Sequence, residues 1–113
     1  MISYLRANVR CVDTWKDQDS LGIRFRFLDG LWTEFTFDLF LALWDRNPAN
    51  SRVCCQLLAE IHRAAGISKL YDTVQLHGSE FAATVQYDPA RGYIGIQRIM
   101  DFTPAYKADT CPA

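Results

Sequence analysis

The sequence predicts a single α+β domain in which a mostly antiparallel, twisted sheet carries two helices packed on one face, in the order βββ-αα-βββ. Apolar and polar residues alternate through the first third of the chain, which is typical of strands with one face in solvent. The middle third has helix-start signals and an apolar stripe with helical spacing. In the last third, apolar and polar residues alternate again, in segments that are bounded by turn-forming residues. A curved or partly closed sheet would fit the same pattern.

The first predicted strand spans residues 5–15, and a polar loop at 16–20 follows it. Two further strands, 21–28 and 31–37, form a hairpin. A two-residue Asp-Gly loop would put the aromatic residues of the second strand on the wrong face. A three-residue loop, Leu28-Asp29-Gly30, with Gly30 left-handed in a G1 bulge, restores agreement between the apolar faces. The predicted pairs are Ile23 with Phe35, Phe25 with Thr33, and Phe27 with Leu31.

This register places Trp32 on the outward face of the hairpin, across from Arg26. Arg24 lies across from Glu34 on the same face. Trp and Arg are residue types that dominate the energetics of protein interfaces. The outward pair of Trp32 and Arg26 is therefore the strongest functional lead in the sequence.

A short apolar helix is expected over residues 39–45, with Asp38 as its cap and Phe40 and Trp44 four residues apart on one face. A longer helix follows. Asn47 and Pro48 are helix-start signals, and Ser51 is an alternative cap.

The longer helix should run to about Ala65 and stop at Gly66, a C-terminal glycine. Its buried stripe is predicted to contain Val53, Leu57, Leu58, Ile61, Ala64 and Ala65.

A three-stranded meander completes the predicted fold, with strands at 70–77, 81–87 and 93–100. A four-residue loop, Pro89 to Gly92, joins the last two strands. It pairs Tyr87 with Ile94 and Val85 with Ile96. In the predicted strand, Asp72 lies on the same inward face as Leu70, Val74 and Leu76. Either the strand begins at Thr73, or Asp72 has a specific cationic or amide partner, because unpaired burial of a carboxylate is costly.

The domain is expected to span residues 1–103, followed by a loosely ordered tail at 104–113 that contains Pro104 and Pro112. The net charge is −1 with no basic stripe, so nucleic acid is not an expected partner. The apolar run at 39–44 is too short to cross a membrane, and no signal peptide is recognised, so a cytoplasmic location with reduced thiols is expected.

No metal or cofactor is predicted. Cys54 and Cys55 are adjacent in the long helix and point about 100° apart, so they cannot chelate one ion together. Dinucleotide-binding, P-loop and zinc-protease motifs are absent from the sequence. No catalytic residue is assigned. The competing hypothesis is a small enzyme with a site assembled from distant residues, such as His77, Asp72, Glu80 and a cysteine, or a small-ligand carrier with a pocket between helices and sheet.

The sequence therefore favours a non-catalytic protein-interaction domain. We expect a stand-alone bacterial or phage inhibitor, or an immunity-type protein, that blocks a larger enzyme or complex by steric occlusion through its open sheet face. An unguarded edge strand would also permit a homodimer. The predicted binding residues are Arg24, Arg26, Trp32, Glu34, Tyr71 and Tyr93.

Overall fold

The computed structural model describes residues 2–67, 69 and 72–105. In this part of the chain, five strands form one antiparallel sheet, together with one α-helix and three short 3₁₀ helices. The strands are β1 (Ser3–Asp17), β2 (Ser20–Phe27), β3 (Thr36–Leu41), β4 (Glu80–Tyr87) and β5 (Ile96–Pro104). The helices are α1 (Pro48–Ala64), η1 (Gly30–Trp32), η2 (Thr73–Leu76) and η3 (Pro89–Gly95).

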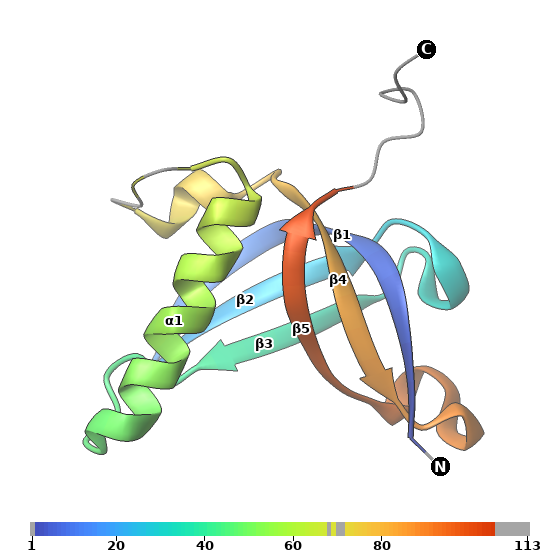
Figure 1. Ribbon diagram of the computed structural model, residues 1–113, viewed down its shortest axis with the longest axis horizontal. Coiled ribbons are helices and arrows are strands. Elements are labelled where there is room, and N and C mark those ends of the chain that lie inside the picture. Colours follow the sequence, from blue (N-terminus) through green and yellow to red (C-terminus); the bar gives the residue numbers. More distant parts are fainter. Residues whose placement is uncertain (1, 68, 70–71, 106–113) are drawn as a thin grey trace.

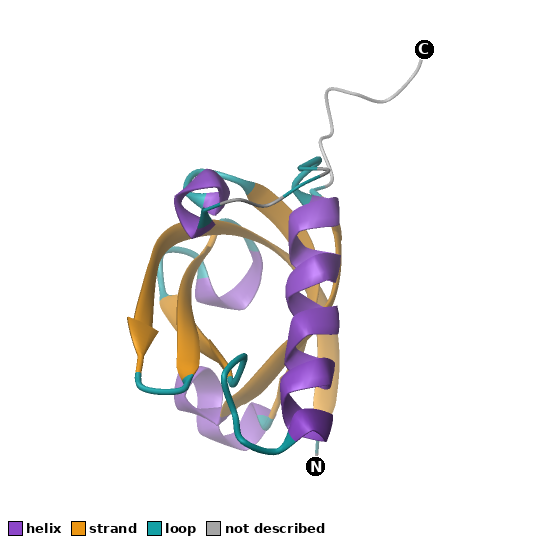
Figure 2. Cartoon of the chain, turned by 90° about the vertical axis from the view of Figure 1, so that its left-hand side faces the viewer, coloured by secondary structure: helices purple, strands orange, loops and turns teal. Residues whose placement is uncertain are grey.

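The strand order in the sheet is β3-β2-β1-β4-β5. Strands β1 to β3 follow one another as antiparallel neighbours, and the chain then returns through α1 and η2 so that β4 pairs with the other side of β1. This connectivity is a Greek key. The sheet curls on itself into a partly open barrel, as Figures 1 and 2 show.

The long central strand β1 belongs to both halves of the curled sheet. Its first part, residues 3–10, pairs with β4, and its second part, residues 9–17, pairs with β2. A β-bulge at Val12 interrupts the register between Cys11 and Asp13. Bulges bend a strand and increase its twist. After the bulge, the residues of β1 that face outward are the odd-numbered ones.

Helix α1 contacts both edge strands of the sheet, β3 and β5, and so lies across the opening of the barrel. The carboxylate of Glu60 on α1 accepts a hydrogen bond from the backbone N–H of Phe102 on β5, at 2.7 Å. An edge strand presents backbone groups that need partners. Helix α1 supplies a partner for one of these groups, the N–H of Phe102.

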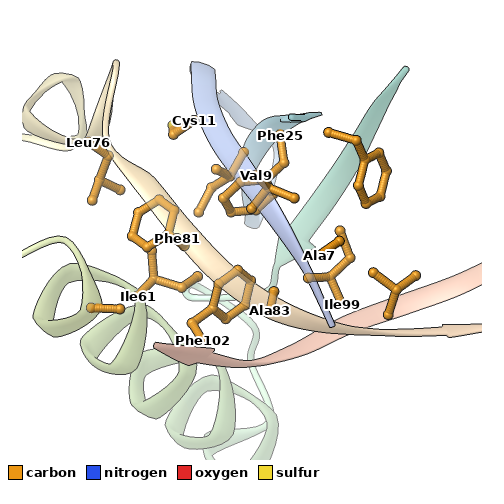
Figure 3. Packing of buried hydrophobic residues seen from close by; sticks show 14 of the residues in the cluster. Ala7, Val9, Cys11, Phe25, Ile61, Leu76, Phe81, Ala83, Ile99 and Phe102 are labelled. Atoms are coloured by element: carbon orange, nitrogen blue, oxygen red, sulfur yellow. The ribbon is translucent and has the colours of Figure 1, made fainter. Parts of the chain in front are cut away.

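The hydrophobic core fills the inside of the barrel (Figure 3). Three phenylalanines meet at its centre: Phe25 lies 6.0 Å from Phe81 and 5.4 Å from Phe102, measured between ring centroids. Val9 on β1 pairs with Phe27 on one side and Phe81 on the other. Ile61 from α1 and Leu76 from η2 are fully buried against this cluster.

The predicted βββ-αα-βββ order with two helices is wrong: the described chain has five strands and one α-helix. The segment expected to be a helix over 39–45 instead supplies the second half of strand β3, residues 39–41, and the turn that follows it. Short apolar runs fit a helix or a strand equally well, and pairing with β2 decides the outcome here. Leu41 is buried, whereas Phe40 beside it faces solvent.

The predicted hairpin register is also wrong. Phe25 pairs with Phe37 and not with Thr33, because the connection from β2 to β3 contains the 3₁₀ turn η1 and is longer than three residues. Gly30 does adopt the left-handed conformation that was predicted, with φ of 80°. Glu34 has a φ of 78° in the same connection.

The segment predicted as a strand over 70–77 contains the 3₁₀ helix η2. Asp72 is exposed and caps this helix: its side chain accepts a hydrogen bond from the N–H of Val74, while Gln75 bonds back to the N–H of Asp72. An amide partner for Asp72 is therefore present, but in a helix cap and not in a buried strand.

The last strand begins three residues later than predicted, because η3 replaces the expected four-residue loop. Tyr87 pairs with Ile96, and Val85 pairs with Ile99. Strand β5 reaches Pro104, one residue past the predicted domain boundary. Residues 106–113 of the predicted tail lie outside the described residues.

The long helix is confirmed with its signals. Asn47 caps it by accepting a hydrogen bond from the N–H of Ala49, Pro48 is its first residue, and Gly66 follows it with a φ of 79°. Within the predicted stripe, Ile61 and Ala64 are buried and Leu57, Leu58 and Ala65 pack against the core. The prediction that Val53 belongs to this stripe is wrong, since Val53 is 64% exposed.

Candidate functional site

The outer face of β1, β2 and β3 carries a row of three residues next to the β1–β2 turn. Trp15 pairs with Gly22, and Gly22 pairs with Phe40. Direct cross-strand partners lie on the same face of a sheet. The indole of Trp15 lies over Gly22 and meets Phe40 edge to face, with 5.8 Å between ring centroids and 84° between ring planes. Phe40 remains 51% exposed.

The neighbouring row on this face is charged. Arg24 pairs with Asp13 on one side and Asp38 on the other. Its Nε donates to Asp38 Oδ1 at 2.8 Å, and its Nη2 donates to Asp38 Oδ2 at 3.2 Å. The guanidinium also lies 5.2 Å from the centroid of Trp15. The hydrogen bond that Arg24 donates to the Asp38 carboxylate raises the pKa of Arg24 above its ordinary value, so Arg24 is cationic at any physiological pH.

A third aromatic residue lies on the other side of the same turn. The backbone N–H of Trp44 donates to the carbonyl of Asp19 at 3.1 Å, which places Trp44 beside the turn. The Nζ of Lys16 lies 4.7 Å from the centroid of the Trp44 ring. Trp44 is 49% exposed. We call Trp15, Phe40 and Trp44 together the aromatic patch.

Among the predicted binding residues that the structure describes, Trp32 does not lie on the outer face. Trp32 was predicted to face outward, but it is only 4% exposed and packs in the core, 5.6 Å from Phe27 and 4.9 Å from Tyr87 between ring centroids. The turn η1 carries Trp32 inward because the chain does not extend as a strand at this point. The predicted pairing of Trp32 with Arg26 is therefore wrong.

Arg26 instead forms an ion pair with Glu34, and Arg24 pairs with Asp38 and not with Glu34. Of the predicted binding residues, Arg26 and Glu34 are exposed and Arg24 is partly exposed. Tyr71 lies outside the described residues, as does the side chain of Tyr93. The prediction that these two tyrosines extend the site stays a prediction.

Sequence reasoning missed the aromatic patch for two identifiable reasons. The alternation that buries Ala7 and Val9 would also bury Trp15, but the bulge at Val12 reverses which residues face outward. The apolar run predicts a helix that carries Phe40 and Trp44, but this helix does not form. Phe37, Leu39 and Leu41 recur at two-residue spacing, which is a signal for a strand in this segment.

The residues of the enzymatic alternative have separate structural contacts. Asp72 caps η2, and Glu80 forms an ion pair with Arg10 at 2.6 Å. His77 Nε2 lies 2.9 Å from the hydroxyl of Thr14, which ties η2 to β1. Burial raises the pKa of the Cys11 thiol to about 11, so it is protonated at neutral pH and not a ready nucleophile.

A pocket of about 340 Å³ lies at the C-terminal end of α1. It is lined by Ala64, Ala65, Gly78, Glu80, Pro104 and Ala105. Among residues 2–67, 69 and 72–105, no three His, Cys, Asp or Glu side chains are grouped so that they could hold a metal ion. No described helix combines the length and the apolar character needed to cross a membrane.

Comparison of the chain with known protein families, curated proteins and solved structures found no match. The geometry of the aromatic patch is therefore the basis for inferring a function. Its features are three aromatic rings around one tight turn, two of them about half exposed, with charged residues beside them.

Proposed function

We propose that this protein is a non-catalytic interaction domain that binds another protein through the aromatic patch and blocks a larger enzyme or complex by steric occlusion. The observation that carries the proposal is the grouping of Trp15, Phe40 and Trp44 around the β1–β2 turn. Single exposed apolar residues are ordinary on protein surfaces. An exposed apolar group with a polar rim is typical of an interaction site.

The patch has aromatic side chains of the kind that contribute most to interface stability. Trp and other aromatic side chains bury large areas and are enriched among the residues whose truncation weakens binding most. Phe40 and Trp44 each leave about half of their surface in solvent. A partner that covers them would therefore gain apolar burial that the fold itself does not use.

The patch is also held in place before any partner arrives. Trp15 is supported by the backbone of Gly22 below it, by the edge of Phe40 and by the guanidinium of Arg24. A side chain that is already ordered loses less conformational entropy on binding. This support favours recognition by a preformed surface over recognition that requires local rearrangement.

Affinity capture from a lysate of the source organism tests the proposal. The wild-type protein is compared with a Phe40→Ala, Trp44→Ala double variant and with a Phe35→Ala control. Phe35 is 49% exposed but follows η1 in the connection that leads into β3, away from the β1–β2 turn. We expect a stoichiometric protein to be captured by the wild type and the control and lost from the double variant.

Two results would contradict the proposal. One is a partner retained fully by the double variant, which would move the site away from the patch. The other is capture that fails for all three proteins. If the captured partner is an enzyme, the occlusion mechanism further predicts that an equimolar amount of wild-type protein inhibits it, and that the double variant does not.

A further inference from the structure

We infer that the partner segment covering the aromatic patch is basic, with arginine or lysine side chains that bind between the rings and the carboxylates next to them. This inference rests on the proposed function and names the chemistry of the partner. The observation that carries it is the position of Trp15, which lies between Asp13 and Asp17 on the outward face of β1. Residues two apart on a strand face the same side.

The β1–β2 turn region is acidic. Residues 13–20 have the sequence DTWKDQDS, with three aspartates and one lysine. Asp13, Asp17 and Asp19 are all exposed.

The cations near the patch have intramolecular partners. Arg24 forms a two-pronged contact with Asp38, and Lys16 lies over the ring of Trp44. The outer face around Trp15 and Phe40 therefore presents aromatic surface together with an excess of carboxylate.

Aromatic rings and carboxylates are together suited to a guanidinium or ammonium group. A cation is attracted to the face of an aromatic ring, most strongly when the ring is Trp. Arginine in addition donates in a planar fork that matches a carboxylate. The contacts of Arg24 with Trp15 and of Lys16 with Trp44 are intramolecular examples of the same attraction in this patch.

The same charges argue against a nucleic acid as the occupant. Exposed aromatic rings can stack on bases, but binding of a single strand also requires a positively charged groove along its phosphates. Around Trp15, in contrast, the exposed side chains of Asp13 and Asp17 are negatively charged. Their carboxylates would repel a phosphate backbone.

The test is an NMR titration of the full-length, ¹⁵N-labelled protein with three probes of equal length. These are an octapeptide of alternating arginine and glycine, the matching peptide of glutamate and glycine, and a thymidine octanucleotide. We expect only the arginine peptide to bind saturably. The indole N–H of Trp15 and the amides of residues 13–24 and 38–41 should shift, and the affinity should fall as salt is added.

Charge-removing variants locate the interaction. Asp13→Asn with Asp17→Asn should weaken binding of the arginine peptide about fivefold. The Asn at position 13 retains an oxygen for the N–H of Thr14, which Asp13 bonds at 2.9 Å. The matched control is Asp88→Asn with Asp101→Asn, which removes two charges outside β1–β3 and should leave the affinity unchanged.

Saturable binding of the glutamate peptide or of the oligonucleotide at this face, or equal affinity in the two double variants, would overturn the inference. The proposed function can fail separately. Partner capture that depends on Phe40 and Trp44 but not on Asp13 and Asp17 would uphold the interaction domain and overturn the basic partner. Binding of the arginine peptide without any captured partner would contradict the proposed function alone.

Discussion

The indole of Trp15 lies directly on the backbone of Gly22, so closely that a Cβ atom added at position 22 would be 2.3 Å from Cε2 of the ring. Gly22 is the cross-strand partner of Trp15, and it is buried although it has no side chain. A glycine within a strand is typical of a site where another group approaches the backbone closely. Here that group is the ring that anchors the aromatic patch.

Gly22→Ala should displace the Trp15 ring and lower the free energy of unfolding by about 1–3 kcal/mol, as overpacking commonly does. In a Trp15→Ala background the same change should be neutral or stabilising by up to about 1 kcal/mol, because the obstructing ring is gone and alanine suits a strand better than glycine. Urea unfolding of the four proteins measures both values. Equal costs in the two backgrounds would show that the ring does not determine the identity of residue 22.

Trp32→Ala should be among the most destabilising single changes in the chain. The ring is buried between Phe27 and Tyr87, so truncation removes apolar burial and leaves a cavity that costs about 3–5 kcal/mol. Trp44→Ala is the matched control, since that ring is half exposed and its loss should cost about 1 kcal/mol or less. Chemical denaturation of both variants separates them. A larger loss for Trp44→Ala would contradict the assignment of Trp32 to the core.

Stability should fall in alkaline solution because of Cys11. Its thiol is fully buried, and burial raises its pKa from 9.0 to about 11. Well below pH 9 the thiol is protonated in both the folded and the unfolded state and contributes no pH dependence. Between pH 9 and about 11 the unfolded chain loses this proton while the folded chain keeps it, so the free energy of unfolding decreases, by about 2–3 kcal/mol in total.

Other groups titrate in the same range, so the Cys11 contribution is measured as a difference. The free energy of unfolding is followed from pH 7 to 11 for the wild type and for Cys11→Ala. We expect the wild type to lose more stability than the variant above pH 9. Parallel pH profiles would contradict a raised pKa for this thiol.

The hydrogen bond from the Phe102 N–H to Glu60 should contribute to holding α1 against β5. Glu60→Ala removes the acceptor and should cost about 1–3 kcal/mol, with faster amide exchange at Phe102. Glu60→Gln keeps a carbonyl oxygen and should cost less. Denaturation and hydrogen exchange measure the two effects. If the alanine and glutamine variants behave alike, the bond does not contribute measurably.

Local signals predicted part of this fold well. The cap at Asn47, the proline at 48 and the glycine at 66 defined α1 almost to the residue, because each acts through its own backbone geometry. The left-handed conformation of Gly30 was predicted for the same reason. Signals of this kind do not depend on the rest of the chain.

Features that depend on distant parts of the chain could not be predicted from one sequence. The inward turn of Trp32 needs the space beside Tyr87, which β4 provides more than 50 residues later. Strand β3 needs β2 as a partner, since its apolar run alone would suit a helix.

The aromatic patch depended on such a feature as well. It was hidden by the bulge at Val12, which has no sequence signature in this chain and reverses the outward positions of β1. The prediction that Trp32 faces outward is therefore wrong, and Trp15 lies on the outer face of the first three strands, which remains the proposed binding surface.

Site-specific photocrosslinking at position 40 tests the central claim most directly. The photoreactive amino acid p-benzoylphenylalanine replaces Phe40, whose ring is already half exposed, and replaces Phe35 in a matched control. After irradiation in a lysate of the source organism, we expect one discrete crosslinked protein from position 40 and none of that mass from position 35. A crosslink of equal yield from both positions, or from position 35 alone, would contradict binding through the aromatic patch.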